Sequence, residues 1–256
     1  MIAVALALAL SPCPALPGAE ALWATPRRWI VVGESHGTAE APAAFGDLVC
    51  RAGSRRPVVA AVEQPASDQP LIDAFMTSDG GEAARAALLK ADMWTSRDGR
   101  SSQAYLALFE RLRLMVREGM VRRVVAFQPM WQGPSFDAAA YEAAMAKLLR
   151  DASPDAETRV VALVGNVHAM LREVHFGNKA YMPAAALLPR GETLTLNVSG
   201  NGGSAWNCTE AGCGAHDLGP QPQSYPRGIV LGGDMPWSGV FHLGTATTAS
   251  LPVMPN

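Results

Sequence analysis

The sequence predicts a single α/β domain with a largely parallel central sheet flanked by helices. Short apolar runs rich in β-branched residues recur along the chain, and each is as continuously hydrophobic as a strand buried on both faces. Helix-like stretches separate these runs, and such alternation is typical of βαβ units. The composition agrees: 49% of the 256 residues are hydrophobic and 17% are charged. The chain therefore has enough apolar surface for one large core.

The central strands and helices are expected at regular intervals. The four buried strands are expected at residues 29–32, 57–62, 122–127 and 159–164. The helices between them are expected at 41–52, 71–76 with 83–91, 101–118 and 136–151. In the long helix one apolar face repeats every three or four residues, through Tyr105, Leu108, Phe109, Leu112 and Met115.

The last third of the chain has a different character and is expected to be mostly strand and loop. Residues 193–199, 228–232 and 239–243 are typical of short strands, and 200–227 is a Gly/Pro-rich loop. We expect these strands to extend one edge of the sheet and the long loop to lie over it. With no repeat or low-complexity linker in the sequence, one domain is expected over residues 25–256.

The N-terminus is similar to a secretory signal peptide. Residues 1–10 are almost entirely apolar, and small residues around Ala19-Glu20-Ala21 provide a cleavage-like site, although no Lys or Arg precedes Arg27. The apolar stretch is too short for an ordinary membrane-spanning helix. We therefore expect a signal peptide over residues 1–21, an exported protein, periplasmic or secreted, and no stable membrane span.

Three cysteines follow that expected cleavage site. Cys208 and Cys213 lie in a Gly-rich loop that can fold back on itself, and an oxidising compartment permits a disulfide between them. The alternative is a metal clip with His216, but two thiols and one imidazole make an incomplete zinc set. Cys50 lies in an apolar helical pattern and is expected to be a buried free thiol.

The charge balance narrows the class of partner. The formal net charge is −2, and Lys and Arg are scattered along the chain. Phosphate binding needs a concentrated basic footprint, so nucleic acid is not expected as a partner. A small-molecule partner is expected instead.

Polar residues follow three of the four buried strands. The strand at 29–32 leads into Glu34 and His36, the strand at 57–62 into Glu63, and the strand at 159–164 into His168. The carboxyl ends of parallel strands line one crevice, so these side chains are expected to converge. Two Glu and two His at one place make either a general-base constellation or a metal site with nitrogen and oxygen ligands.

Three further residues are candidates for the same site. Arg172 lies four residues after His168, so a helix beginning there would place its guanidinium beside the imidazole, able to hold an oxyanion. The alternative is an ion pair with Glu173. Trp94 and Arg100 precede the long helix and are candidates to line a substrate pocket, although Asp98 and Arg100 can equally be a turn-stabilising pair.

Several familiar catalytic patterns are absent from the sequence. It contains no G-x-S-x-G elbow, P-loop, G-x-G-x-x-G or H-E-x-x-H motif. Ser35 stands in Gly-Glu-Ser-His-Gly, which is not the flanking pattern of a serine nucleophile.

The motifs resemble those of a known superfamily. Gly33-Glu34-Ser35-His36-Gly37-Thr38, Glu63 and Gly165-Asn166-Val167-His168 are similar to motifs of the superfamily that unites erythromycin esterases, ChaN-like haem-binding uptake proteins and Tiki/TraB metalloproteases. The first motif is nearest to the esterase branch. The resemblance covers residues 28–175, with a weaker similarity over 239–252.

The resemblance implies a hydrolase, with two alternatives. In esterase relatives such a His activates water, which implies His36 as general base, Glu34 and Glu63 as its orienting groups, and His168 with Arg172 as oxyanion stabilisers. The bond would be an ester, lactone or amide. The alternatives are a haem- or metal-binding uptake protein without turnover, and a hydrolase in which Glu34, His36, Glu63 and His168 hold a divalent ion. The chain is much shorter than the full-length esterases, which argues against a macrolide substrate.

Overall fold

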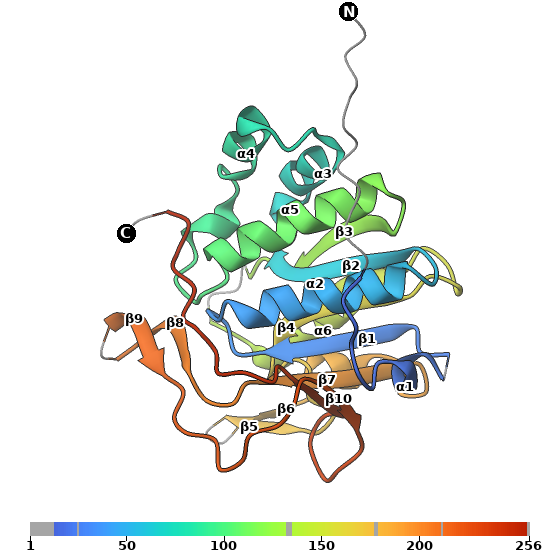
Figure 1. Cartoon of the computed structure of the whole chain (residues 1–256), viewed down its shortest axis with the longest axis vertical. Helices are drawn as coiled ribbons and strands as arrows, with labels where there is room; N and C mark the ends of the chain where they lie inside the picture. Colours follow the sequence, from blue (N-terminus) through green and yellow to red (C-terminus); the bar gives the residue numbers. More distant parts are fainter. Residues whose placement is uncertain (1–12, 25, 132–134, 177–178, 211, 255–256) are drawn as a thin grey trace, which may run out of the picture.

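A seven-stranded sheet lies between two layers of helices in this computed structural model (Figure 1). The structure describes residues 13–24, 26–131, 135–176, 179–210 and 212–254. The strand order is β10-β11-β7-β1-β4-β2-β3, and all neighbours are parallel except β10 and β11. The expected fold, an α/β domain with a largely parallel sheet, is confirmed.

The strands and helices lie close to their expected positions. The sheet consists of β1 (Trp29–Glu34), β2 (Val58–Pro65), β3 (Val121–Gln128), β4 (Val160–Gly165), β7 (Thr193–Ser199), β10 (Gly228–Leu231) and β11 (Gly239–His242). The helices are α1 (Glu20–Trp23), α2 (Glu40–Gly53), α3 (Gln69–Thr77), α4 (Glu82–Leu88), α5 (Gln103–Arg117) and α6 (Ala138–Asp151). Short 3-10 turns occur at Ala66–Asp68, Asp92–Thr95 and Ala184–Leu187.

Alternate residues of each central strand point to opposite faces of the sheet. Ile30 and Val32 of β1 pack into the core beneath α2, α3 and α5, whereas Val31 packs on the other side with α6 and the turn Ala184–Leu187. This period of two is the geometry of a pleated strand. Both faces are covered, which explains why the central strands are continuously hydrophobic.

Two hairpins lie outside the main sheet. One is β5 (Val174–Phe176) with β6 (Lys179–Tyr181), and the other is β8 (Ser204–Thr209) with β9 (Gly212–Asp217). The second hairpin falls within the segment expected to be loop. The bond between Cys208 and Cys213 joins its two strands, at the pairing that the sequence favoured. Gly37, with φ +89°, passes against the Trp206 carbonyl, so a Cβ there would lie 1.9 Å from that oxygen.

The segment before β1 is part of the folded domain. Leu16, Ala19 and Leu22 are buried, and Glu20 pairs with Arg55 of the segment after α2. The folded domain therefore begins earlier than the expected residue 25. The expected signal peptide lies outside the described residues over 1–12, and its boundary at residue 21 cuts through this packed segment.

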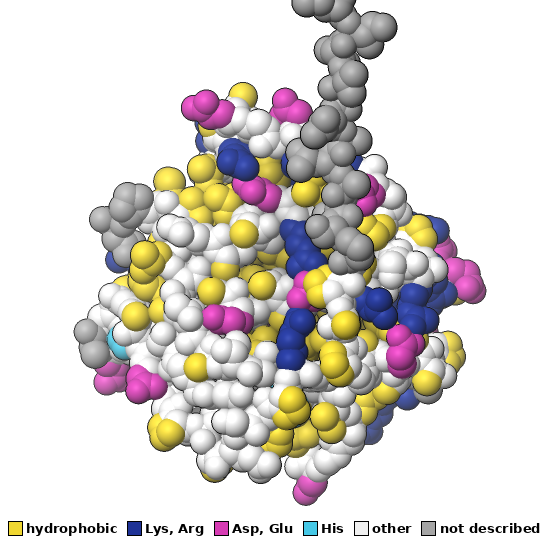
Figure 2. All heavy atoms as spheres, viewed as in Figure 1, with side chains coloured by type: hydrophobic (Ala, Val, Ile, Leu, Met, Phe, Trp, Pro, Cys, Tyr) yellow, Lys and Arg dark blue, Asp and Glu magenta, His cyan; other side chains and the backbone are white. Residues whose placement is uncertain are grey.

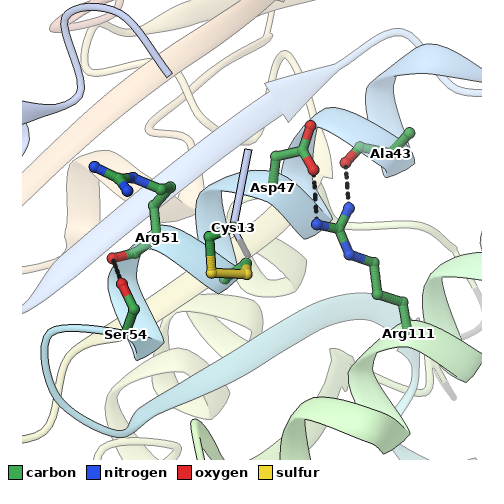
Figure 3. The surroundings of a disulfide bond; sticks show 7 residues. Cys13, Ala43, Asp47, Arg51, Ser54 and Arg111 are labelled. Atoms are coloured by element: carbon green, nitrogen blue, oxygen red, sulfur yellow. Dashed lines mark hydrogen bonds and ion pairs between the residues drawn. A yellow bond between two sulfur atoms is a disulfide. The ribbon is translucent and has the colours of Figure 1, made fainter. Parts of the chain in front are cut away.

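The expected free thiol at Cys50 is wrong, because Cys50 is bonded to Cys13 (Figure 3). The bond fastens the N-terminal segment to the middle of α2. Sequence patterns place Cys50 on a buried helical face correctly, but they carry no information on a partner that packs there from outside the helix.

Breaking this disulfide is expected to destabilise the protein. The bond closes a loop between residues 37 positions apart, so the Cys13→Ser/Cys50→Ser variant is expected to lose about 4 kcal/mol of unfolding free energy. Urea denaturation under non-reducing conditions measures the loss. The matched control is Cys208→Ser/Cys213→Ser, whose bond spans 5 positions and constrains the unfolded chain less. An equal loss in both variants would contradict the expectation.

Two surface properties bear on the expected partners. On the face shown in Figure 2, basic side chains of the described residues lie in several separate groups beside acidic ones. Within the described part of the chain, no helix combines the length and the apolar character that crossing a bilayer needs.

Candidate active site

A Glu–His pair stands at the end of β1. Glu34 is the last residue of that strand, and its Oε1 lies 2.8 Å from His36 Nδ1 and accepts a hydrogen bond from Tyr105 Oη at 2.9 Å. A carboxylate is only an acceptor, so Nδ1 carries the imidazole proton. In the neutral ring Nε2 is therefore left with a lone pair, as a base requires.

A second Glu–His pair has the same design. His168 lies in the turn after β4, and its Nδ1 is 2.6 Å from Oε1 of Glu142 on α6. The other oxygen of Glu142 accepts the Ala184 backbone N–H at 2.7 Å. Glu142 is buried, so both contacts fix its carboxylate and, through it, the orientation of the His168 ring.

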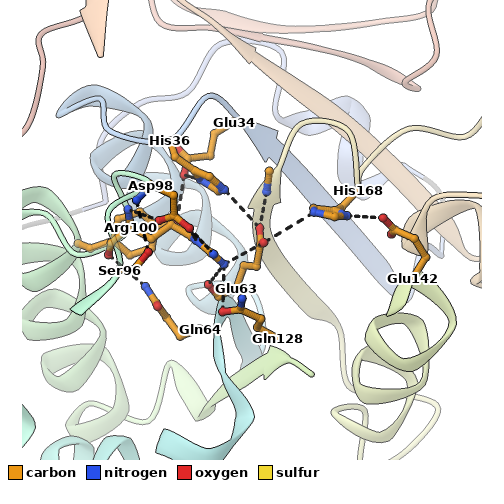
Figure 4. Close-up of polar contacts among 12 residues, drawn as sticks. Glu34, His36, Glu63, Gln64, Ser96, Asp98, Arg100, Gln128, Glu142 and His168 are labelled. Atoms are coloured by element: carbon orange, nitrogen blue, oxygen red, sulfur yellow. Dashed lines mark hydrogen bonds and ion pairs between the residues drawn. The ribbon is translucent and has the colours of Figure 1, made fainter. Parts of the chain in front are cut away.

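Both histidines turn Nε2 toward one carboxylate, that of Glu63 on β2 (Figure 4). His36 Nε2 is 3.6 Å from Oε2 of Glu63, and His168 Nε2 is 3.8 Å from Oε1. The Gly165 backbone N–H donates to Oε2 at 2.6 Å. The ends of β1, β2 and β4 thus bring Glu34, His36, Glu63 and His168 together.

The Arg100 guanidinium contacts both the carboxylate and the backbone carbonyl of Glu63. Its Nη1 lies 2.9 Å from Glu63 Oε1 and also donates to the Glu63 backbone carbonyl at 2.8 Å. Asp98 accepts from Arg100 Nε at 3.0 Å, and Gln128 Oε1 accepts from Nη1 at 3.2 Å. Arg100 therefore forms the turn-stabilising pair with Asp98 and supports Glu63 in the site. It is buried and does not line the cleft over the histidines, where it was expected to bind substrate.

The pKa values follow from these contacts. Burial lowers the pKa of His36, but the hydrogen bond and charge of Glu34 and the charge of Glu63 outweigh it and raise the pKa above the ordinary 6.5. The pKa of His168 is raised in the same way, because Glu142 and Glu63 outweigh burial. For Glu63, burial raises the pKa, but Arg100 and the two imidazoles reverse the effect and lower it below 4.5.

The pH dependence of catalysis is a test of the first pair. If neutral His36 is the base, kcat/KM falls as pH decreases through the His36 pKa, with a midpoint above 6.5. In Glu34→Gln the carboxylate that raises this pKa is gone, so the midpoint is expected at lower pH than in the wild type. Initial rates between pH 5 and pH 9 measure both. Glu157→Gln, an exposed carboxylate, is the control, and a midpoint that does not move in Glu34→Gln would contradict this assignment.

A polar cleft opens over the two histidines. Its volume is about 380 Å³, and Val167 and Leu218 supply its apolar side chains among otherwise polar or glycine walls. Gly165 forms part of the floor, where a Cβ would lie 3.1 Å from His36 Nε2. The glycine therefore leaves space at the point where the two imidazoles converge. Asn207 of the disulfide-closed hairpin also lines the cleft.

Two of the expected site residues lie elsewhere. Arg172 is wrong as an oxyanion stabiliser: the segment after His168 is a turn and not a helix, and Arg172 pairs with exposed Asp234. Trp94 is wrong as a pocket residue. Its ring is buried in the core beside Phe109, and its Nε1–H donates to the Leu88 carbonyl at 2.9 Å.

The site also contains residues that sequence reasoning missed. Glu142 carried a readable signal, because it shares the buried face of α6 with Met145, Ala146 and Leu149 at helical spacing, where a lone carboxylate needs a partner. Tyr105 carried none, since it fits the apolar face of α5 as well as a phenylalanine would. Asn207 lies in a segment expected to be loop.

The residues at the site do not fit a metal ion. Among the described residues, no group of three or more His, Cys, Asp or Glu side chains is arranged to hold a metal ion. The carboxylate of Glu63, which lies between the two histidines, is already paired with the Arg100 guanidinium, and a divalent cation there would meet that positive charge.

Comparisons with known proteins find solved structures with a similar fold. No family model matches the sequence, and no curated protein matches it. Among solved structures, a succinoglycan biosynthesis protein superposes with a TM-score of 0.64 at 9% identity, covering 88% of this chain and 89% of that one. A mutant of erythromycin esterase EreC in its open conformation superposes with a TM-score of 0.62 at 10% identity, covering 89% and 88%.

The fold is erythromycin esterase-like. A protein from Bacillus cereus adds a third match, with a TM-score of 0.60 at 10% identity and coverage of 90% and 91%. The likeness extends over nearly the whole of each chain. The resemblance that the sequence motifs indicated is confirmed at the level of the fold.

Proposed function

We propose that this protein hydrolyses ester, lactone or amide bonds without a metal ion. One observation carries the proposal: two imidazoles, each held at Nδ1 by its own carboxylate, direct Nε2 toward one buried carboxylate beside an open cleft. This arrangement supports the assignment of a base, an orienting group and a proton donor that act at one point, as hydrolysis by activated water requires.

His36 is the general base in this proposal. Its Nε2 takes a proton from water, and the water oxygen forms a bond to the carbonyl carbon. The Glu34 carboxylate beside Nδ1 stabilises the imidazolium that results. Tyr105 donates to the same oxygen of Glu34 and keeps the carboxylate in place.

His168 is the proton donor. The carboxylates of Glu142 and Glu63 stabilise its imidazolium form. The imidazolium stabilises negative charge on the substrate oxygens and gives its Nε2 proton to the leaving alkoxide or amine as the bond to the carbonyl carbon breaks. Glu63 balances whichever imidazole is charged, and Arg100 keeps Glu63 ionised. Arg100 takes no direct part, because it acts through Glu63.

A panel of small esters, lactones and amides tests the proposal. Wild-type protein is expected to release acid from at least one class, measured by pH-stat titration, and His168→Ala is expected to slow release most for substrates with poor leaving groups. Elemental analysis and an absorption spectrum of the same sample are the controls. Stoichiometric metal whose removal abolishes activity, or a Soret band, would contradict metal-free hydrolysis.

We also propose that the protein is exported. Two disulfides within one domain are typical of proteins that fold in an oxidising compartment. Because Cys13 is paired with Cys50, a leader compatible with this fold ends before residue 13. Intact-mass measurement of protein from the periplasm or medium tests this, and a mature chain that begins at residue 22 would contradict it.

A further inference from the structure

A row of aromatic side chains leads from the site to the surface. Trp131, Phe136 and Tyr141 follow one another to the His168 ring, and we call these three the aromatic row. The ring centroids are 5.6 Å apart from Trp131 to Phe136, 5.3 Å from Phe136 to Tyr141, and 6.2 Å from Tyr141 to His168. Each step is within the range of direct ring contact.

The outer end of the row is solvent-exposed, which is unusual for aromatic rings. The exposed fraction is 59% for Phe136 and 37% for Trp131, and neighbouring Met130 is 58% exposed. The inner end is fixed, because Tyr141 packs against the core on the α6 side of the sheet. Exposed apolar side chains that contact one another are typical of surfaces that bind a ligand or partner.

The row supplies carbocyclic aromatic rings, which the cleft lining lacks. The apolar side chains of the cleft are Val167 and Leu218, and neither offers a ring on which a substrate ring could stack. The row begins at His168, which in the proposed mechanism protonates the leaving group. An apolar group on the leaving-group side of the scissile bond would therefore extend from His168 along Tyr141 to Phe136.

We propose that the aromatic row binds an apolar ring in the alcohol portion of an ester substrate. The inference rests on the proposed hydrolase function and adds a substrate class to it: esters of alcohols that carry an aromatic or alicyclic ring. Ring stacking and burial of Phe136 and Trp131 supply the binding energy. The row contributes binding and takes no part in bond breaking.

Two acetate esters with alcohols of similar reactivity test the proposal. We expect kcat/KM for 2-phenylethyl acetate to exceed that for ethyl acetate by about tenfold, mainly through KM, because the phenyl ring gains contact with the row. In Phe136→Ala and Trp131→Ala this ratio is expected to fall toward unity. Tyr225→Ala is the control, an exposed aromatic stacked on His242 away from the row, and should keep the wild-type ratio.

A binding measurement separates this inference from the proposed function. His36→Ala, which the mechanism makes inactive, is titrated with 2-phenylethyl acetate by calorimetry, alone and combined with Phe136→Ala. Weaker binding in the double variant supports the row even if no ester is hydrolysed by the wild type. Equal binding in both, a wild-type ratio retained in the row variants, or a dimer in sedimentation that Phe136→Ala dissolves would overturn it.

Discussion

Replacing His36 by alanine is expected to lower kcat for the preferred ester about a thousandfold, since a positioned general base contributes on the order of 10²–10⁴. The loss should fall on kcat, with little change in KM, because His36 acts on the attacking water and does not grip the substrate. Steady-state kinetics on wild type and His36→Ala measure the two constants separately.

The control for His36→Ala is the replacement of a histidine outside the site. His175 on β5 has a side chain that is 70% exposed and contacts Glu173, so His175→Ala should retain wild-type kinetics. Thermal unfolding of both variants shows whether they remain folded. Added imidazole can enter the space that His36→Ala creates, and partial recovery of kcat would identify the missing group as a base. A loss of less than tenfold would place the base elsewhere.

The residues found from the sequence and those missed differ in how they are positioned. Glu34, Glu63 and His168 follow strands that are hydrophobic on both faces, and parallel strands necessarily bring their carboxyl ends to one edge. Their convergence was therefore readable from strand pattern alone. Glu142 reaches the site from α6, and its contact with His168 depends on how that helix packs across the sheet. Local periodicity shows that it is buried but not what it faces.

The errors have equally specific physical reasons. Arg172 was placed beside His168 on the assumption of a helix, but backbone hydrogen bonds from His168 to Gly165 and from Met170 to Val167 close a turn there. Cys50 was expected to be free because its partner, Cys13, lies in the segment that resembles a cleaved leader. Long-range packing decides both outcomes.

Removing the Arg100 guanidinium, which is paired with Glu63, is expected to destabilise the protein strongly. Glu63 is only 3% exposed, so in Arg100→Met its carboxylate loses its main partner in a buried place, at a cost of about 3–5 kcal/mol near neutral pH. Arg123→Met is the control. Arg123 pairs with Asp73 on the surface, where side chains 54% and 44% exposed make such a pair worth about 0–1 kcal/mol.

The loss of unfolding free energy in Arg100→Met should depend on pH. The ion pair between Arg100 and Glu63 determines the direction of that dependence. In the wild type the pKa of Glu63 is lowered, so its ionised pair contributes stability above the unfolded-state value of about 4.5, and that contribution is lost as pH falls through the lower folded-state pKa. Without Arg100, burial dominates and Glu63 takes up a proton more readily. The difference in unfolding free energy between wild type and variant should therefore be larger at pH 7.5 than at pH 4.

Urea denaturation of wild type, Arg100→Met and a double variant at the two pH values identifies the cause of the lost stability. Arg100→Met/Glu63→Gln replaces the stranded carboxylate by a neutral amide, which can still accept the Gly165 N–H. The double variant should recover much of the stability lost in Arg100→Met at pH 7.5, because breaking a buried pair costs more than removing both charges. If the double variant is as unstable as the single one, the role of Arg100 is to pack the turn with Asp98 and Gln128, and another group keeps Glu63 ionised.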